Sequence, residues 1–210
     1  MYVAFSGHRS TPVAQRGDCC YTSQPMTDHP PVATVRDFLD AALEPWSGRV
    51  GVFGMNAPIL FRGQANTHSL LPCLFRSDEP SDLRNAAFIN PRLREEQRFL
   101  ERFKSDSPYL LPSVPTNEWD WLSMAQHFGL PTRLLDWTAN PLTALFFAVE
   151  PERCWKPVVY AYRNCVAKCV ITQDMKKSVD PFAITVTKVF QPSWHSVRVS
   201  LQAGWHTAHM

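Results

Sequence analysis

Apolar residues recur at helical intervals in the first two thirds of the chain. After Thr34 they follow a spacing of three and four residues, and Asp37 stands where a capping box has its acidic residue. An asparagine followed by a proline, a combination that favours a helix start, occurs at Asn90 and again at Asn140. The pattern predicts helices that begin at Thr34, at Asn90, near residue 118 and at Asn140.

The helices predicted near residue 118 and after Asn140 flank the stretch QHFGLPTRLLDWTAN, in which polar residues interrupt an apolar run. The first of the two carries its apolar side chains on one stripe, with His127 off that stripe, and is expected to stop at Gly129. The second, PLTALFFAV, is apolar almost all round, which predicts a central helix. We expect the polar stretch between them to be an irregular connection that presents one or two side chains to a cleft.

Partly alternating, β-branched segments dominate the last third of the chain and predict strands there. An earlier strand is predicted at residues 59–64, ILFRGQ, running into a glycine turn. The predicted fold class is α+β, with N-terminal helices and a mostly antiparallel sheet. Residues 1–33 are rich in Pro, Ser and Thr without a period, so we expect a poorly ordered extension before a domain over 34–210. The later strands are expected in VVYAYR, KCVITQ, AITVTKVF and SVRVSLQAGWHTAH.

The composition of the 210-residue chain is that of a soluble globular protein, with 45% hydrophobic and 19% charged residues. A net charge of +2 without a long basic run gives no strong nucleic-acid signal. The longest apolar run is about half of the roughly 20 residues that cross a bilayer, so no membrane association is expected. Six irregularly spaced cysteines and the lack of a secretion signal predict a cytoplasmic protein.

Cysteines and histidines of the second half include the residue types of a zinc site, but they form no Cys-x2-Cys pair or other close pair of ligands. We therefore expect buried thiols and no metal. The chain also lacks G-x-S-x-G, Walker and G-x-G-x-x-G motifs, which argues against the common hydrolase, nucleotide-triphosphatase and dehydrogenase classes. The residues in question are Cys154, Cys165, Cys169, His195, His206 and His209.

Three blocks, in this order along the chain, resemble the FRG domain family: LFRGQANTHSLLPCLFR (60–76), WDWLSMAQHFGLPTRLLDWTANPLTALFFA (119–148) and VRVSLQAGWHTAH (197–209). The family is named for an aromatic-Arg-Gly signature, which stands here in LFRGQ. The resemblance implies a fold similar to that of the ADP-ribosyltransferases and a protein of bacteria or their phages. Because members usually continue well past the third block, it also implies a domain that is short at its C-terminus.

Arg62 is the first candidate binding residue. It ends the predicted strand directly before Gly63, so its guanidinium could contact a phosphate bidentately while the glycine lets the backbone approach the ligand. Gln64 could add an amide contact. The alternative is structural, with Arg62 paired to a carboxylate and Gly63 needed only for a turn.

The polar stretch after the third predicted helix supplies further candidates. His127 could donate to a ribose hydroxyl or merely cap the last carbonyls of its helix. Arg133 and Asp136, three residues apart, could form a pair that directs Arg133 toward an anion, with Trp137 as a stacking face. For Asp136 and Asn140 we favour a capping role at the following helix over a catalytic one.

Gln202 is the candidate of the last block. Alternation places it on the same strand face as Arg198, and by resemblance it lies about where a transferase carries its late-strand glutamate. A glutamine can orient a substrate hydroxyl but cannot act as a carboxylate base. Transfer would need a carboxylate from elsewhere, for which Glu95, Glu96 and Glu150 are candidates.

The main hypothesis is an intracellular FRG-domain protein with a cleft for NAD or a related nucleotide. NAD would be its substrate, in an ADP-ribosyltransferase-like or NAD-consuming toxin or defence protein, and no macromolecular target is indicated. The alternatives are a non-enzymatic module that binds a nucleotide or a protein through the same cleft, and a truncated, inactive domain. The binding candidates are Arg62, Gly63, Gln64 and Arg133, and the catalytic candidates are Gln202 and His127.

Overall fold

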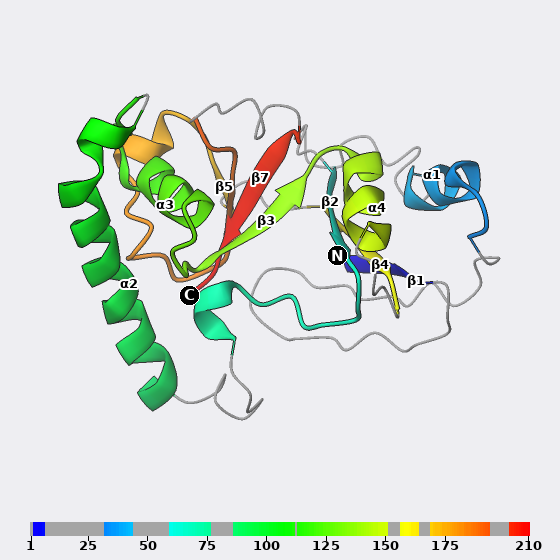
Figure 1. The fold of residues 1–210 in the computed structure, drawn as a ribbon, viewed down its shortest axis with the longest axis horizontal. Helices are drawn as coiled ribbons and strands as arrows, with labels where there is room; N and C mark the ends of the chain where they lie inside the picture. Colours follow the sequence, from blue (N-terminus) through cyan, green and yellow to red (C-terminus); the bar gives the residue numbers. More distant parts are fainter. Residues whose placement is uncertain are drawn as a thin grey trace. The chain divides into compact units, whose positions relative to one another are not determined.

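In the computed structural model the chain forms two compact units. Figure 1 labels the helices and strands and colours them along the sequence. Unit 1 comprises Met1–Ser69, Trp137–Val170 and Arg198–Trp205, and unit 2 comprises Leu70–Asp136, Ile171–Val197 and His206–Met210. Strands β3 (Leu134–Thr138) and β7 (Gly204–Ala208) contribute residues to both units. The structure describes residues 2–6, 32–43, 59–76, 86–111, 113–150, 156–163, 169–193 and 202–210.

Unit 1 contains an antiparallel sheet. Its strand order is β1 (Tyr2–Ser6), β4 (Val158–Arg163), β2 (Ile59–Gln64) and β3. In the register of β2 and β4, Arg62 lies opposite Tyr160. Successive side chains of a strand point to opposite faces, so this register fixes which side chains share a face.

Two helices of unit 1, α1 (Val35–Leu43) and α4 (Pro141–Val149), contribute to one apolar cluster. The predicted caps are confirmed: Thr34 Oγ1 accepts from the Asp37 N–H at 3.1 Å, and Asn140 Oδ1 accepts from the Leu142 N–H at 2.9 Å. The cluster consists of Phe38, Ala42, Phe61, Ala144, Ala148, Val159 and Ala161.

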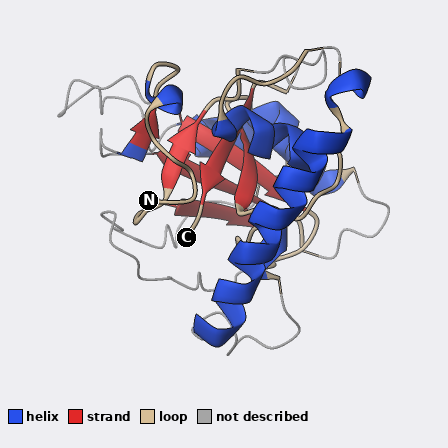
Figure 2. Ribbon diagram, turned by 90° about the vertical axis from the view of Figure 1, so that its left-hand side faces the viewer, coloured by secondary structure: helices blue, strands red, loops and turns tan. Residues whose placement is uncertain are grey.

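Unit 2 contains the long helix α2 (Ala86–Asp106), prominent in Figure 2, and α3 (Glu118–His127). Its strand order is β3, β7, β6 (Lys188–Phe190) and β5 (Val170–Ile171), and β6 pairs antiparallel with β7. Short 3-10 turns lie at Cys73–Phe75, Pro108–Leu110 and Met175–Lys177. The buried core of this unit is Leu100, Trp119, Trp121, Leu122, Ala125, Leu134, Ile171, Ile184, Phe190 and Ala208.

The end of α3 follows the prediction. Gly129 has a φ of +91°, the left-handed conformation that glycine adopts without steric cost. Its N–H donates to Gln126 O at 2.9 Å, and the Leu130 N–H donates to Ala125 O at 3.0 Å. This pair of bonds is a Schellman motif, which satisfies the last carbonyls of the helix.

The α+β class is confirmed, but the order of elements is corrected. β1 precedes every described helix, whereas residues 1–33 were expected to be a poorly ordered extension; residues 7–31 lie outside the described part. β3 lies between α3 and α4, where an irregular connection was expected. Its burial pattern explains the error, because every residue of β3 except Asp136 is buried and the strand lacks the alternation of a half-buried one.

Two helix predictions are also wrong in detail. α2 begins at Ala86, not at Asn90, so Pro91 lies inside the helix and removes one backbone hydrogen bond without ending it. α4 is not central: Phe146 is 54% exposed, and the helix buries only the small side chains Ala144 and Ala148. None of the helices in the described part of the chain has the length and hydropathy needed to cross a bilayer.

Candidate functional site

Gly63 lies inside β2, paired with Val159, and not in a turn as predicted. A Cβ atom built on Gly63 would lie 1.7 Å from Ala144 O and 2.8 Å from Ala148 N, both in the backbone of α4. The absent side chain therefore lets α4 pack directly on the strand. The close approach that the glycine permits is that of a helix, not that of a ligand as we had expected.

Arg62 and Gln64 lie on the other face of β2, because side chains alternate along the strand. Both are half-buried, and Tyr160 of β4 lies directly opposite Arg62 on this face. We assign the Gln64 amide from its two neighbours: its oxygen faces Arg62 Nε at 3.3 Å, as an acceptor must, and its nitrogen faces His68 O at 3.1 Å, as a donor must. The Tyr160 hydroxyl donates to the same carbonyl at 3.3 Å.

The electrostatics of this face involve Arg62 directly. Burial raises the pKa of the Tyr160 phenol, and the positive charge of Arg62 opposes that rise. Tyr160 therefore stays a neutral hydrogen-bonding group at physiological pH. The guanidinium is the group of this half-buried surface that suits an anion, because the amide and the phenol both donate to His68 O.

An aromatic pair extends the same face. Tyr162 lies opposite Leu60, two residues from Arg62 along the sheet, and its ring centroid is 5.5 Å from that of Trp137 in β3. Trp137 is only 3% exposed, so its ring supports the face from within and is not the open stacking surface that we predicted. We refer to Arg62, Gln64, Tyr160 and Tyr162 as the β2–β4 face.

Gln202 also belongs to unit 1, but it does not lie on a strand. It occupies a two-residue turn before β7, and the following Ala203 has a φ of 46°. The Thr138 hydroxyl donates to Gln202 O, and the Ala139 N–H donates to Ala203 O at 3.1 Å, so the turn is tied to the end of β3. Gln202 therefore does not share a strand face with Arg198 by alternation, as we had predicted. Residues 194–201 lie outside the described part. The catalytic role of Gln202 stays a prediction.

Arg133 in unit 2 is committed to a buried ion pair with Glu96. Their side chains are 3% and 1% exposed, and Arg133 Nε donates to Glu96 Oε2 at 2.6 Å. Arg133 also donates to Pro181 O at 3.2 Å, and its guanidinium carbon lies 4.9 Å from the Phe182 ring centroid. Burial raises the pKa of the Glu96 carboxyl, while the hydrogen bond and charge of Arg133 oppose the rise.

This pair corrects two predictions. Arg133 was expected to pair with Asp136 and to bind an anion, but Asp136 points outward from β3 and is 63% exposed. Residues three apart in extended chain lie on opposite faces, so this pairing would need a helix. Glu96 serves as a counterion in the core and is not a spare carboxylate, whereas Glu95 and Glu150 are exposed.

Ser123, His206 and Asp136 have the spacing of a Ser-His-Asp triad. Ser123 Oγ lies 2.8 Å from His206 Nε2, and His206 Nδ1 lies 3.2 Å from Asp136 Oδ1. Their exposures are the reverse of those in a hydrolase, because the serine is 4% exposed and the carboxylate faces solvent. The hydroxyl cannot meet a substrate, so we assign the trio a structural role.

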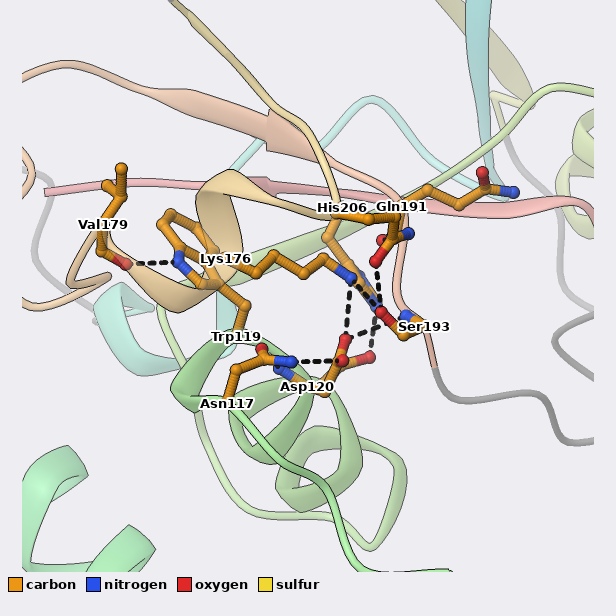
Figure 3. A network of polar contacts seen from close by, with 10 residues as sticks. Asn117, Trp119, Asp120, Lys176, Val179, Gln191, Ser193 and His206 are labelled. Carbon is orange, nitrogen blue, oxygen red and sulfur yellow. Dashed lines mark hydrogen bonds and ion pairs between the residues drawn. The ribbon is translucent and has the colours of Figure 1, made fainter.

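A second buried network of unit 2 was not predicted from the sequence (Figure 3). Asp120 Oδ1 accepts from Lys176 Nζ and from the Ser193 N–H, each at 2.8 Å, and Asn117 donates to Asp120 Oδ2 at 2.7 Å. Lys176 Nζ also donates to Ser193 Oγ at 2.8 Å. In the sequence, the local signal for this network was the charged residue Asp120 within the apolar stripe of a helix. Its partner Lys176 could not be identified, because it follows 56 residues later.

Burial acts on both members of this network. It raises the pKa of Asp120, but the hydrogen bonds from Lys176, Ser193 and Asn117 outweigh it and the net shift is downward. It lowers the pKa of Lys176, and Asp120 offsets only part of that shift. The network is therefore an ion pair that supports the packing of α3 within unit 2.

The remaining predicted positions are His127 and the cysteines and histidines that were considered as zinc ligands. His127 ends α3 and is exposed, with its ring 5.5 Å from that of Phe128, and its catalytic role stays a prediction. Cys169 is buried, as expected. Within the described residues no three His, Cys, Asp or Glu side chains gather as metal ligands would. Cys154, Cys165 and His195 lie outside those residues.

Comparison with known proteins gives one match. The family description "FRG domain" matches residues 57–155, a segment that runs from just before β2 to just after α4. No curated protein and no solved structure matches the chain. The match includes the Phe61, Arg62 and Gly63 signature as well as α3, β3 and α4, and on this basis the chain contains an FRG domain.

Proposed function

We propose that unit 1 binds a dinucleotide such as NAD on the β2–β4 face, with Arg62 contacting a phosphate. The observation that carries the proposal is the half-buried guanidinium of Arg62, oriented by Gln64 and placed beside Tyr160. A planar guanidinium can hold a phosphate through two parallel hydrogen bonds, which a lysine cannot do. Partial burial strengthens such a contact because water screens it less.

Chemistry beyond binding would need further residues. Gln202, which belongs to unit 1 as Arg62 does, would orient a ribose hydroxyl in an ADP-ribosyltransferase-like reaction, and the catalytic role of His127 stays a prediction from the sequence. Of the three glutamates considered as a source of the carboxylate, Glu96 is occupied by Arg133, and Glu150 is the one that belongs to unit 1. The position of Gln202 in a turn favours a second candidate function, a module that binds the nucleotide without consuming it.

The test is the thermal unfolding midpoint of the protein with and without millimolar NAD. A ligand at about 100 times its Kd stabilises the folded state by about 2.7 kcal/mol, a shift of several degrees for a protein of this size. We expect Arg62→Ala to abolish the shift. Arg94→Ala, which removes an exposed arginine of α2, should retain it and serves as the matched control.

The same titration separates the alternatives. Stabilisation by NAD, together with a loss of NAD that chromatography detects, would support a NAD-consuming enzyme. Stabilisation with intact NAD would support a binding module. A cooperatively folded protein that shows no shift with NAD, or the same shift in Arg62→Ala, would overturn the proposed site.

A further inference from the structure

Gln64 occupies a special position on the β2–β4 face, because both ends of its amide are used within the protein. Its oxygen accepts from Arg62 Nε at 3.3 Å, and its nitrogen donates to His68 O at 3.1 Å. The side chain thus connects the guanidinium to the backbone of the segment that follows β2. A glutamine used in this way has little capacity left to contact a ligand.

The carbonyl of His68 is itself fixed from a second side. The Tyr160 hydroxyl donates to it at 3.3 Å, and the Lys156 N–H donates to Ala65 O at 3.4 Å. The segment after β2 is therefore tied to Tyr160 of β4 and to Lys156, which precedes β4. Gln64 transmits this rigidity to Arg62.

From this geometry we infer that Gln64 is a positioning residue for Arg62 and not a ligand of the bound nucleotide, an inference that rests on the proposed site. A hydrogen bond from Nε sets the plane of the guanidinium. The two terminal nitrogens, which would contact the phosphate, then face in one direction. Bidentate recognition of a phosphate depends on that direction. Removing Gln64 leaves the charge of Arg62 in place but takes away one of the contacts that set the plane of its guanidinium, so an entropic cost falls on binding.

A double-mutant cycle with Arg62→Lys tests the inference. Lysine keeps the positive charge but has no Nε, so Gln64 has nothing to orient in that background. In the wild-type background we expect Gln64→Ala to weaken NAD binding about tenfold, which corresponds to the loss of one good hydrogen bond. In the Arg62→Lys background we expect Gln64→Ala to leave the affinity for NAD unchanged. Titration calorimetry of the four proteins measures the cycle, with Gln97→Ala, an exposed glutamine of α2, as control.

A measurement without ligand completes the test. The exchange rate of the Arg62 Nε–H with water, measured by NMR, should rise about tenfold in Gln64→Ala because its acceptor is lost. Gln64→Glu keeps an acceptor for Nε but loses the donation to His68, so it should retain the slow exchange. Faster exchange in both variants would show that Gln64 acts on the segment after β2 and not on Arg62.

The outcomes are distinguishable. Equal weakening by Gln64→Ala in both backgrounds would make Gln64 an independent ligand contact and overturn the inference, while the nucleotide site stands. A wild type that binds no NAD would overturn the proposed function, and the Nε–H exchange then decides by itself whether Gln64 orients Arg62. Unchanged exchange in Gln64→Ala would overturn the inference whatever the binding data show.

Discussion

In unit 2, Arg133 and Lys176 are buried and lie 2.6 and 2.8 Å from the buried carboxylates of Glu96 and Asp120, whereas Arg62 of unit 1 is half-buried beside an amide and a phenol. A buried ion pair that makes its hydrogen bonds to groups inside the protein supports packing and is closed to a ligand. Arg62 is only half-buried, so its guanidinium keeps access to solvent and to an anion that approaches from it. The comparison teaches that burial and partners, and not residue type, separate the structural arginine from the candidate binding one.

Gly63→Ala should have the largest effect and would break the comparison on the side of unit 1. Its Cβ would collide with the backbone of α4 at 1.7 Å, so the helix must move off β2 and the β2–β4 face is expected to lose its support. We expect a loss of more than about 3 kcal/mol of unfolding free energy, or no cooperative unfolding of unit 1, in urea titrations.

Gly129→Ala is the matched control for that change. Gly129 has a positive φ, but nothing lies within 4 Å of an added Cβ, so only backbone strain of about 1 kcal/mol is expected. Equal losses for the two variants would contradict the packing role of Gly63.

Lys176→Met should have an effect of similar size and tests the buried pairs of unit 2. The change leaves the carboxylate of Asp120 buried without its charged partner, which costs about 4 kcal/mol in comparable pairs. Chemical denaturation measures the loss. Lys177→Met, which removes the exposed neighbouring lysine, should cost less than about 0.5 kcal/mol, and similar values for the two variants would show that the buried pair is not structural.

A smaller effect is the dependence of the unfolding free energy on pH, which involves His209 of unit 2. Burial lowers the pKa of His209 to about 4, from 6.5 in the unfolded chain. Between these values the unfolded state binds a proton that the folded state does not, so the unfolding free energy falls as the pH falls from 6.5 to 4. The total loss is about 3 kcal/mol, and there is no contribution above pH 7.

His209→Gln should remove this component. We expect the difference in unfolding free energy between wild type and variant to change by about 3 kcal/mol between pH 7 and pH 4, measured in urea. A constant difference across that range would show that His209 is not held neutral in the folded protein.

Signals that act over a few residues were predicted well. The caps at Thr34 and Asn140 and the end of α3 at Gly129 were all visible in the sequence, because a cap needs only a side-chain oxygen close to a free N–H and a glycine that accepts a positive φ. The FRG signature was visible as well, although the reason for its glycine was not. The structural role of Gly63 depends on Ala144, which comes from a distant part of the chain.

What the sequence could not reveal is the partner of each charge. Arg133 seemed to belong with Asp136 because the two are close in the chain, but its partner Glu96 lies 37 residues earlier. β3 was missed because the burial of every residue except Asp136 removes the alternation that marks a strand. The side chains that orient Arg62 were half visible, since Gln64 is a neighbour in the sequence while Tyr160 joins it only through the pairing of β2 and β4.

The sequence by itself determined the FRG domain match, the α+β class and the local ends of helices, since these depend on residue types and on contacts within one or two turns of chain. Tertiary structure decided which polar groups are buried pairs and which share the β2–β4 face. The physical reason is that the free energy of a charge depends on its burial and on the groups around it, and segments distant in the chain supply both.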